Sequence, residues 1–377
     1  MNLRRTRAVA RKEFLHVLRD PRSLIMALAI PMVMLLLFGY ALSLDVDRIP
    51  TLILDGDRSP ESRALVERFH GSRYFQILGF VEEYAAIERE MDRNRILLGL
   101  VIPRGYSRSL LSGEQATIQA LLDGSDSNTA SIALGYVEAL VGAYALDLRS
   151  EALQRQGGGT LEPPVQPQLR VWYNTELKSK NYIVPGLIAV IMMIIAALLT
   201  SLTIAREWEM GTMEQLLSTP VRPAELVLGK MTAYFTIGMV DMAIALSVGV
   251  FLFSVPLRGS VLFLFVTCGV FLFGALCWGI LLSALARSQL LAYQMGMITS
   301  FLPAFLLSGF VYAIENMPTI VQLVTYLVPA RYFITALRGI FLKGIGPELI
   351  AAELAFLLAY AAATFFIATR KVGQRIA

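Results

Sequence analysis

Six long apolar stretches constrain the fold of this chain more than any other feature. A helix needs about 20 predominantly apolar residues to cross the hydrocarbon core of a bilayer. The stretches that reach this length are 23–44, 182–204, 227–253, 261–285, 290–312 and 349–369. Only 16% of the residues are charged, whereas a soluble domain has about 25%. The sequence therefore predicts an α-helical membrane protein with six transmembrane helices.

The segment before the first apolar stretch, 1–22, is strongly basic. Its apolar residues fall near one face of a helix: Val9, Phe14, Leu15 and Leu18. A basic amphipathic helix binds the surface of an anionic leaflet, so we expect an interfacial helix on the cytoplasmic side. The leader and the stretch 23–44 are both too long for a cleaved signal peptide, which favours an uncleaved first span.

The distribution of Lys and Arg predicts the orientation. Seven lie in 1–22, and the loop after the second span, the loop after the fourth span and the C-terminal tail add seven more. The short loops on the opposite side hold four. Because cytoplasmic loops are enriched in Lys and Arg, both termini are expected in the cytoplasm.

Residues 45–180 then lie outside and form a domain of their own. They carry 15 of the 33 basic and 19 of the 29 acidic residues. Short apolar segments bounded by turn formers have the pattern of strands: PTLILD, YFQILGFV, ILLGLVIP, ATIQALLD and LRVWYN. Helical spacing alternates with them, and 128–156 predicts a longer helix capped by Asn128. The sequence predicts an extracytoplasmic α/β domain inserted after the first span.

The outer loop before the last span, 313–348, is unusually apolar. The stretch between Pro318 and Pro329 is too short to cross a membrane. A second helical pattern follows it. Two short helices that re-enter the outer leaflet would satisfy their own backbone groups if they pack on the bundle. The alternative is a plain surface loop.

The loop between the second and third spans, 205–229, is compact and charged. A single helix over 206–217 would carry an apolar stripe, and Glu207 and Glu214 would share its flank. The residues of the stripe are Met210, Met213, Leu216 and Leu217. A glycine inside a helix costs about 1 kcal/mol, so Gly211 predicts close approach of another backbone.

Motifs for catalysis or metal binding are missing from the sequence. There is no GxxxxGK(S/T), HExxH, GxSxG or CxxC pattern. Cys268 and Cys277 would lie about 13 Å apart on one helix, too far for a disulfide. His16 and His70 have no ligand-type neighbours. We expect neither enzymatic activity, nor a metal site, nor nucleic-acid binding.

The loop sequence REWEMGTMEQLLSTPV resembles the cytoplasmic loop of ABC-2 type exporter permeases. A second similarity is the stretch SGF…MP…TYLVPARYF in the outer loop. The residues that carry this second similarity are Ser308, Gly309, Pro318, Pro329, Arg331 and Tyr332. The basic N-terminal helix and the six spans fit the same type V exporter-like architecture. The best match is to members with a large extracytoplasmic domain after the first span.

This resemblance implies a transport subunit without a nucleotide site of its own. It implies a coupling helix that seats on a separate ATPase subunit, which would bind ATP and Mg. The residues assigned to coupling are Arg206, Glu207, Glu209, Met210, Gly211, Thr212, Met213, Glu214 and Leu217. Further expected partners are a second permease protomer, identical or paralogous, membrane lipid and a periplasmic adaptor protein. The expected cargo is a hydrophobic or amphiphilic drug or lipid, and the membrane that the resemblance implies is a bacterial inner membrane.

Two further features lie inside the spans. Asp241 is an ionisable residue near the middle of the third span, where such residues face a cavity or a partner. Ala275, Gly279 and Ser283 form a ridge of small residues that permits close helix packing.

Two alternative functions stay open: an ion-coupled secondary transporter that uses Asp241, and a membrane sensor whose outer domain binds a ligand.

Overall fold

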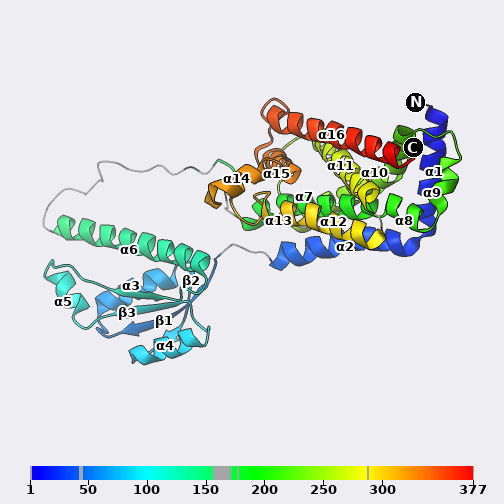
Figure 1. Cartoon of the computed structure of the whole chain (residues 1–377). Helices are drawn as coiled ribbons and strands as arrows, with labels where there is room; N and C mark the ends of the chain where they lie inside the picture. Colours follow the sequence, from blue (N-terminus) through cyan, green and yellow to red (C-terminus); the bar gives the residue numbers. More distant parts are fainter. Residues whose placement is uncertain are drawn as a thin grey trace. The chain divides into compact units, whose positions relative to one another are not determined.

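The computed structural model describes residues 2–41, 46–155, 170, 172–175, 178–286 and 288–376. The chain forms two compact units (Figure 1). The helical unit comprises Met1–Ser43 and Val171–Ala377, and the sheet unit comprises Leu44–Arg170. The sheet unit ends at Arg170, before the end of the predicted domain 45–180, and the next apolar helix begins at Ser179.

Within its described residues, the sheet unit contains four strands in the order β2-β1-β3-β4. They are β1 (Ile49–Asp55), β2 (Phe75–Phe80), β3 (Leu98–Ile102) and β4 (Gln119–Leu122). The first three are parallel, and β4 runs antiparallel to β3. The helices are α3 (Pro60–His70), α4 (Tyr84–Asp92), α5 (Tyr106–Leu111) and α6 (Ser127–Arg155). Two parallel βαβ units, through α3 and α4, therefore build most of the sheet.

This unit has a hydrophobic core on each face of its sheet. Successive residues of β1 belong to different cores, because side chains alternate along a strand. Ile53 packs with α3 and α6 on one face, and Leu52 packs with Ile87 of α4 on the other. Four of the five predicted strands are confirmed. The fifth, LRVWYN at 169–174, is wrong for residues 170 and 172–174, which form no strand and pair with none.

The predicted cap of the long helix is also wrong. α6 begins at Ser127, one residue earlier than expected. Asp126 Oδ1 accepts hydrogen bonds from the backbone N–H groups of Asn128 at 3.1 Å and Thr129 at 3.4 Å. Asp126 therefore caps the helix, since a carboxylate before the first turn satisfies the N–H groups that have no helical partner.

Among the described residues, five helical stretches are long and apolar enough to cross a membrane. They are Ser127–Ala152, Ser179–Glu209, Pro223–Leu252, Val261–Leu285 and Ala351–Gln374. A pair of short helices bent by 81°, Thr319–Thr325 with Pro329–Lys343, brings the number to six if it counts as one span. The first stretch is part of α6, whose Ala133 and Val137 pack on the sheet. The other four match predicted spans.

The helical unit contains the remaining elements. Its long helices are α1 (Leu3–Arg19), α2 (Pro21–Ala41), α7 (Ser179–Ser201), α10 (Pro223–Ser247), α11 (Val261–Leu285) and α16 (Ala351–Ile376). Shorter helices are α12 (Gln289–Gly296), α13 (Leu302–Leu306), η3 (Ile314–Asn316), α14 (Thr319–Thr325) and α15 (Pro329–Arg338). In the described part of this unit, π-helical turns interrupt or extend them: η1 (Val248–Leu252), η2 (Met297–Phe301) and η4 (Gly339–Lys343).

The predicted fifth span, 290–312, is too long at its end. The helical run through α12, η2 and α13 stops at Leu306. Gly309 then adopts φ of +80°, a left-handed conformation that ends a helix. The π-helical turn η2 precedes Pro303, which has no N–H to donate to the previous turn. The proline therefore accounts for the irregular helix.

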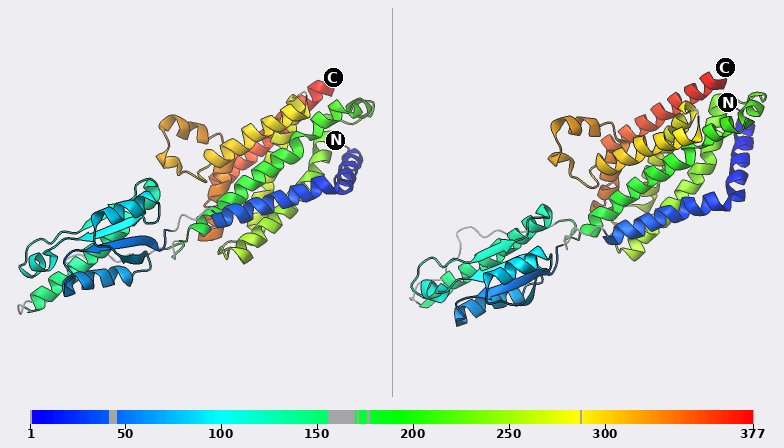
Figure 2. Two further views of the ribbon diagram at one scale, coloured as in Figure 1. Left: turned by 90° about the horizontal axis from the view of Figure 1, so that it is seen from below. Right: turned by 60° about the horizontal axis from the view of Figure 1, so that its bottom comes forward.

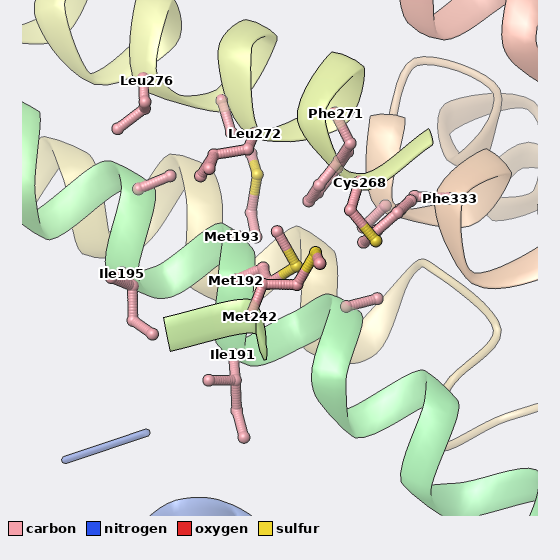
Figure 3. Packing of buried hydrophobic residues seen from close by; sticks show 14 of the residues in the cluster. Ile191, Met192, Met193, Ile195, Met242, Cys268, Phe271, Leu272, Leu276 and Phe333 are labelled. Carbon is pink, nitrogen blue, oxygen red and sulfur yellow. The ribbon is translucent and has the colours of Figure 1, made fainter. Parts of the chain in front are cut away.

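α7 forms the centre of the helical unit. Every residue from Ile183 to Ala197 is buried. Figure 3 shows Met192 and Met193 of α7 meeting side chains of α10 and α11. The rings of Phe271 and Phe333 stack with centroids 4.0 Å apart, which joins α11 to α15. A helix that is apolar all round is buried on every side, and α7 has this pattern.

α1 meets α2 at a sharp bend and lies against α10 (Figure 2). Val9 is buried, and a Cβ at Gly229 of α10 would lie only 2.6 Å from the Val9 Cβ. The other three apolar residues of the predicted interfacial face are exposed by 41–53%: Phe14, Leu15 and Leu18. One part of α1 therefore packs on the bundle, and another part leaves apolar side chains uncovered.

The apolar outer loop forms the two short helices expected from its sequence, α14 and α15. Tyr332 of α15 stacks on Phe356 with ring centroids 3.8 Å apart. The Arg331 guanidinium lies 4.0 Å from the centre of the Tyr326 ring. Gly309 O accepts hydrogen bonds from Tyr182 Oη at 3.1 Å and Arg338 Nη1 at 3.2 Å. These contacts hold the loop against α7 and α16.

Candidate functional site

The loop between α7 and α10 contains two short helices instead of the single predicted helix 206–217. α8 (Thr203–Glu209) ends before α9 (Thr212–Leu217), and Gly211 lies between them with φ of +68°. A Cβ at Gly211 would meet no atom within 4 Å. The expectation of a close backbone approach is therefore wrong. The left-handed backbone, which favours glycine, explains the residue.

Four charged side chains form an ion-pair cluster behind this loop: Lys12 and Glu13 of α1, Glu207 of α8, and Lys230 of α10. Lys230 Nζ lies 2.9 Å from both Glu13 Oε1 and Glu207 Oε1. Lys12 Nζ lies 2.7 Å from Glu207 Oε1. Lys230, Glu13 and Glu207 are only 1%, 3% and 5% exposed. Because buried charges need partners, the cluster ties α1, α8 and α10 together.

The pKa values of the two α1 residues follow from the cluster. Burial alone would raise the pKa of Glu13, but the ammonium groups of Lys230 and Lys12 hold it below its usual value. Burial alone would lower the pKa of Lys12, but the Glu207 carboxylate beside it raises the pKa above its usual value. Both residues therefore keep their charges near neutral pH.

α8 is also tied to α11 and α12. Ser283 Oγ accepts hydrogen bonds from the backbone N–H groups of Ile204 at 2.9 Å and Ala205 at 3.0 Å. Gln289, at the start of α12, donates its backbone N–H to Glu209 Oε1 at 2.7 Å. Its side-chain oxygen accepts from Arg206 Nε at 3.3 Å. The base of the loop is therefore bonded to two further helices.

The predicted ridge of small residues lies along α11, where this helix crosses α7. Ala275 and Ser283 are fully buried. A Cβ at Gly279 would lie 2.0 Å from Thr200 Oγ1 of α7. Thr200 Oγ1 in turn donates to Leu276 O of α11 at 3.0 Å. The absence of a side chain at Gly279 allows this close contact between the helices.

The predicted coupling residues divide into buried and exposed groups. Glu207 and Met213, which is 1% exposed, point into the helical unit. Met210 is 57% exposed, and Glu209 and Glu214 are exposed as well. Glu207 and Glu214 do not share a flank, because the break at Gly211 separates their helices. The side chain of Leu217 lies outside the described residues.

Asp241 of α10 is 1% exposed, and its Oδ1 has no hydrogen-bond partner among the described residues. The structure does not bring Asp241 together with the ion-pair cluster.

Cys268 and Cys277 are both free thiols in the core. Within the described ranges, no three His, Cys, Asp or Glu side chains gather as a metal site would require.

Sequence reasoning missed four residues of this site: Lys12, Glu13, Lys230 and Gln289. One signal was present in the sequence. Glu13 is the one acidic residue in the first 19 residues, where a purely membrane-binding helix has no need of it. Lys230 lies near the start of the predicted third span, where a buried lysine needs a partner, but the sequence does not show that it is buried.

The chain is similar to known transport proteins over its whole length. The family model described as ABC-2 family transporter protein matches residues 21–370. The probable multidrug ABC transporter permease YbhS of Escherichia coli is 36% identical over 100% of this chain and 98% of its own. The probable multidrug ABC transporter permease YbhR of the same species is 31% identical over 94% of both chains.

The inner membrane transport permease YhhJ of Escherichia coli is more distant, at 27% identity over 87% of this chain and 86% of its own. All three alignments extend beyond the loop and the outer helices that first carried the resemblance. With the family model covering most of the residues, this multi-pass membrane protein belongs to the ABC-2 family of transporters.

Proposed function

We propose that this chain is the permease subunit of an ATP-driven exporter, and that a separate ATPase subunit docks on α8 and α9. ATP and Mg would bind in that subunit. The cargo would be hydrophobic or amphiphilic compounds, drugs or lipids, in keeping with the multidrug transport named for YbhS and YbhR. Two permease protomers, identical or paralogous, would form the path in a bacterial inner membrane.

The observation that carries this proposal is the contrast between the two sides of the loop. Its outer side presents Met210 and Glu214, whereas the carboxylate of Glu209 is bonded to Gln289. Its inner side is fixed by the ion-pair cluster, Ser283 and Gln289 to four other helices. A force applied to the outer side is therefore passed to α1, α10, α11 and α12, as a coupling element requires.

The arrangement of the helical unit fits a cytoplasmic position for this loop. The N-terminus, the end of α16 and the α8–α9 loop lie at the same end of the unit (Figures 1 and 2). The backbone N–H of Asn2 donates to Glu225 Oε1 of α10 at 2.5 Å. With the Lys and Arg excess at this end, both termini would be cytoplasmic. The sheet unit would lie outside, where an adaptor protein is a suitable partner.

Charge reversal on the exposed side tests the coupling role. We expect Glu214→Arg and Met210→Asp each to lower substrate-stimulated ATP hydrolysis of the reconstituted transporter at least tenfold, because each places an unpaired charge in a docked interface. Both side chains are exposed, so the melting temperature of the isolated chain should stay unchanged.

Glu348→Arg is the matched control, since Glu348 is exposed and lies near the start of α16, away from the loop. It should leave ATP hydrolysis and transport intact. Full transport by both loop variants, or equal loss with the control variant, would contradict the proposed docking surface.

A further inference from the structure

A cavity of about 610 Å³ lies inside the helical unit, beside the ion-pair cluster. Side chains from α1, α2, α7, α8, α9, α10 and α12 line it. Its volume is within the range of about 300–1,000 Å³ that is usual for small-molecule sites. We propose that this cavity binds amphiphiles that carry a protonated amine on an apolar body. The step from binding to export rests on the proposed function, whereas the binding itself does not.

The walls of the cavity are apolar. Ile30 and Met34 of α2 face this space together with Ile194 and Leu198 of α7 and Ile237 of α10. α7 and α10 are long and apolar enough to cross a membrane, and Leu28–Ala41 of α2 is a shorter apolar helix, so the walls suit an alkyl chain or an aromatic body. Burial of such a body supplies affinity in proportion to its apolar area.

The opposite end of the cavity is charged, and one of its oxygen atoms has no partner. Glu207 lines the cavity and is 5% exposed. Its Oε1 receives both lysines of the ion-pair cluster, at 2.7 and 2.9 Å. Its Oε2 is buried without any hydrogen-bond donor among the described residues. A buried carboxylate oxygen is unfavourable until a donor reaches it, which points to a ligand with N–H groups.

The charges around Glu207 favour a cationic ligand over an anionic one. Both ammonium groups of the cluster are already bonded to Glu13 and Glu207, so fewer of their N–H donors remain for an anionic ligand. The charged residues that line the cavity are Lys12, Arg206 and Lys230 with Glu13, Asp20 and Glu207, so positive and negative groups balance, and His16 also lines it. The rings of Tyr234 and Tyr293 also line the cavity, and aromatic faces attract ammonium groups.

Direct binding tests this proposal without the ATPase. The full-length chain is reconstituted in phosphatidylcholine nanodiscs, and tritiated dodecylamine is titrated by scintillation proximity, with empty nanodiscs subtracted. We expect saturable binding. Dodecanol and dodecanoate should compete at least tenfold more weakly than unlabelled dodecylamine, because they lack the charged donor.

Two variants locate the ligand. Leu198→Trp fills the apolar part of the cavity and should weaken binding at least tenfold, and Glu207→Gln should weaken it about tenfold through the loss of a charge-assisted hydrogen bond. Leu262→Trp is the matched control, because Leu262 is 75% exposed on α11 and does not line the cavity. If Glu207→Gln fails to fold, Leu198→Trp still tests whether the ligand occupies the cavity.

A second set of nanodiscs distinguishes two sources of the amine. Competition by added phosphatidylethanolamine would assign the site to a lipid headgroup, and no competition would assign it to free amphiphilic amines. Non-saturable binding, equal competition by dodecanol, or unchanged binding to Leu198→Trp would overturn the proposal. Failure of the coupling variants with intact amine binding would instead affect only the proposed function.

Discussion

Replacing Lys230 with methionine is expected to lower the free energy of unfolding by about 3–5 kcal/mol, the effect of removing one partner from a buried ion pair. Lys230 is 1% exposed and lies 2.9 Å from two carboxylate oxygens. Without its ammonium group, Glu13 would keep Lys12 at 3.3 Å as its ion-pair partner among the described residues. The loss should appear in unfolding titrations with sodium dodecyl sulfate in mixed micelles.

The matched control for Lys230 is Lys12→Met, which removes the same type of group from the same cluster. The Lys12 side chain is 51% exposed, so the expected loss is at most about 1 kcal/mol. Adding Glu13→Gln to Lys230→Met should recover part of the stability, since the two residues are in contact. Equal losses for Lys12 and Lys230, or no recovery, would show that the cluster does not hold α1 to α10.

Gly279→Ala is expected to destabilise the helical unit by about 2 kcal/mol or more, because overpacking outweighs the gain in helix propensity. The new Cβ would lie 2.0 Å from Thr200 Oγ1 and 3.2 Å from Ala197 O. Either the two helices separate or Thr200 rotates and loses its bond to Leu276 O. The measurement is again the unfolding titration, with the melting temperature as a second readout.

Gly269→Ala is the control on the same helix, since its Cβ would meet ordinary contacts at 3.5 Å and 4.0 Å. It should be neutral or stabilise by up to about 1 kcal/mol. Thr200→Ala added to Gly279→Ala should restore part of the loss by removing the clashing oxygen. A stable Gly279→Ala protein would contradict the close crossing of α7 and α11.

The apolar runs and the strand patterns could be predicted because they depend on local composition. Four spans and four strands follow directly from the period and length of their apolar residues. The first span, predicted at 23–44, corresponds to α2, in which Leu28–Ala41 is a shorter apolar helix among the described residues. The fifth span was predicted too long at its end. The end at Leu306 depends on the backbone conformation of Gly309 and on Pro303, whose effects on a helix are not visible in hydropathy alone.

The sequence predicted the position of the loop between the second and third spans, but not its division into two helices. A glycine at 211 fits either a close backbone contact or a left-handed residue between two helices, and only the fold distinguishes the two. The ion-pair cluster joins residues about 200 positions apart, such as Lys12 and Glu207 with a separation of 195. A sequence pattern does not contain contacts of this kind, which is why Glu207 was predicted to share a flank with Glu214.

Site-specific photocrosslinking tests the central claim most directly. A photoreactive amino acid replaces Met210, which is 57% exposed, in membranes that contain the assembled transporter. We predict a crosslink to an ATP-binding subunit from position 210, and none from position 213, which is 1% exposed, or from 348 near the start of α16. No crosslink from 210, or the same crosslink from 348, would contradict the proposal that this loop is the docking site of the ATPase.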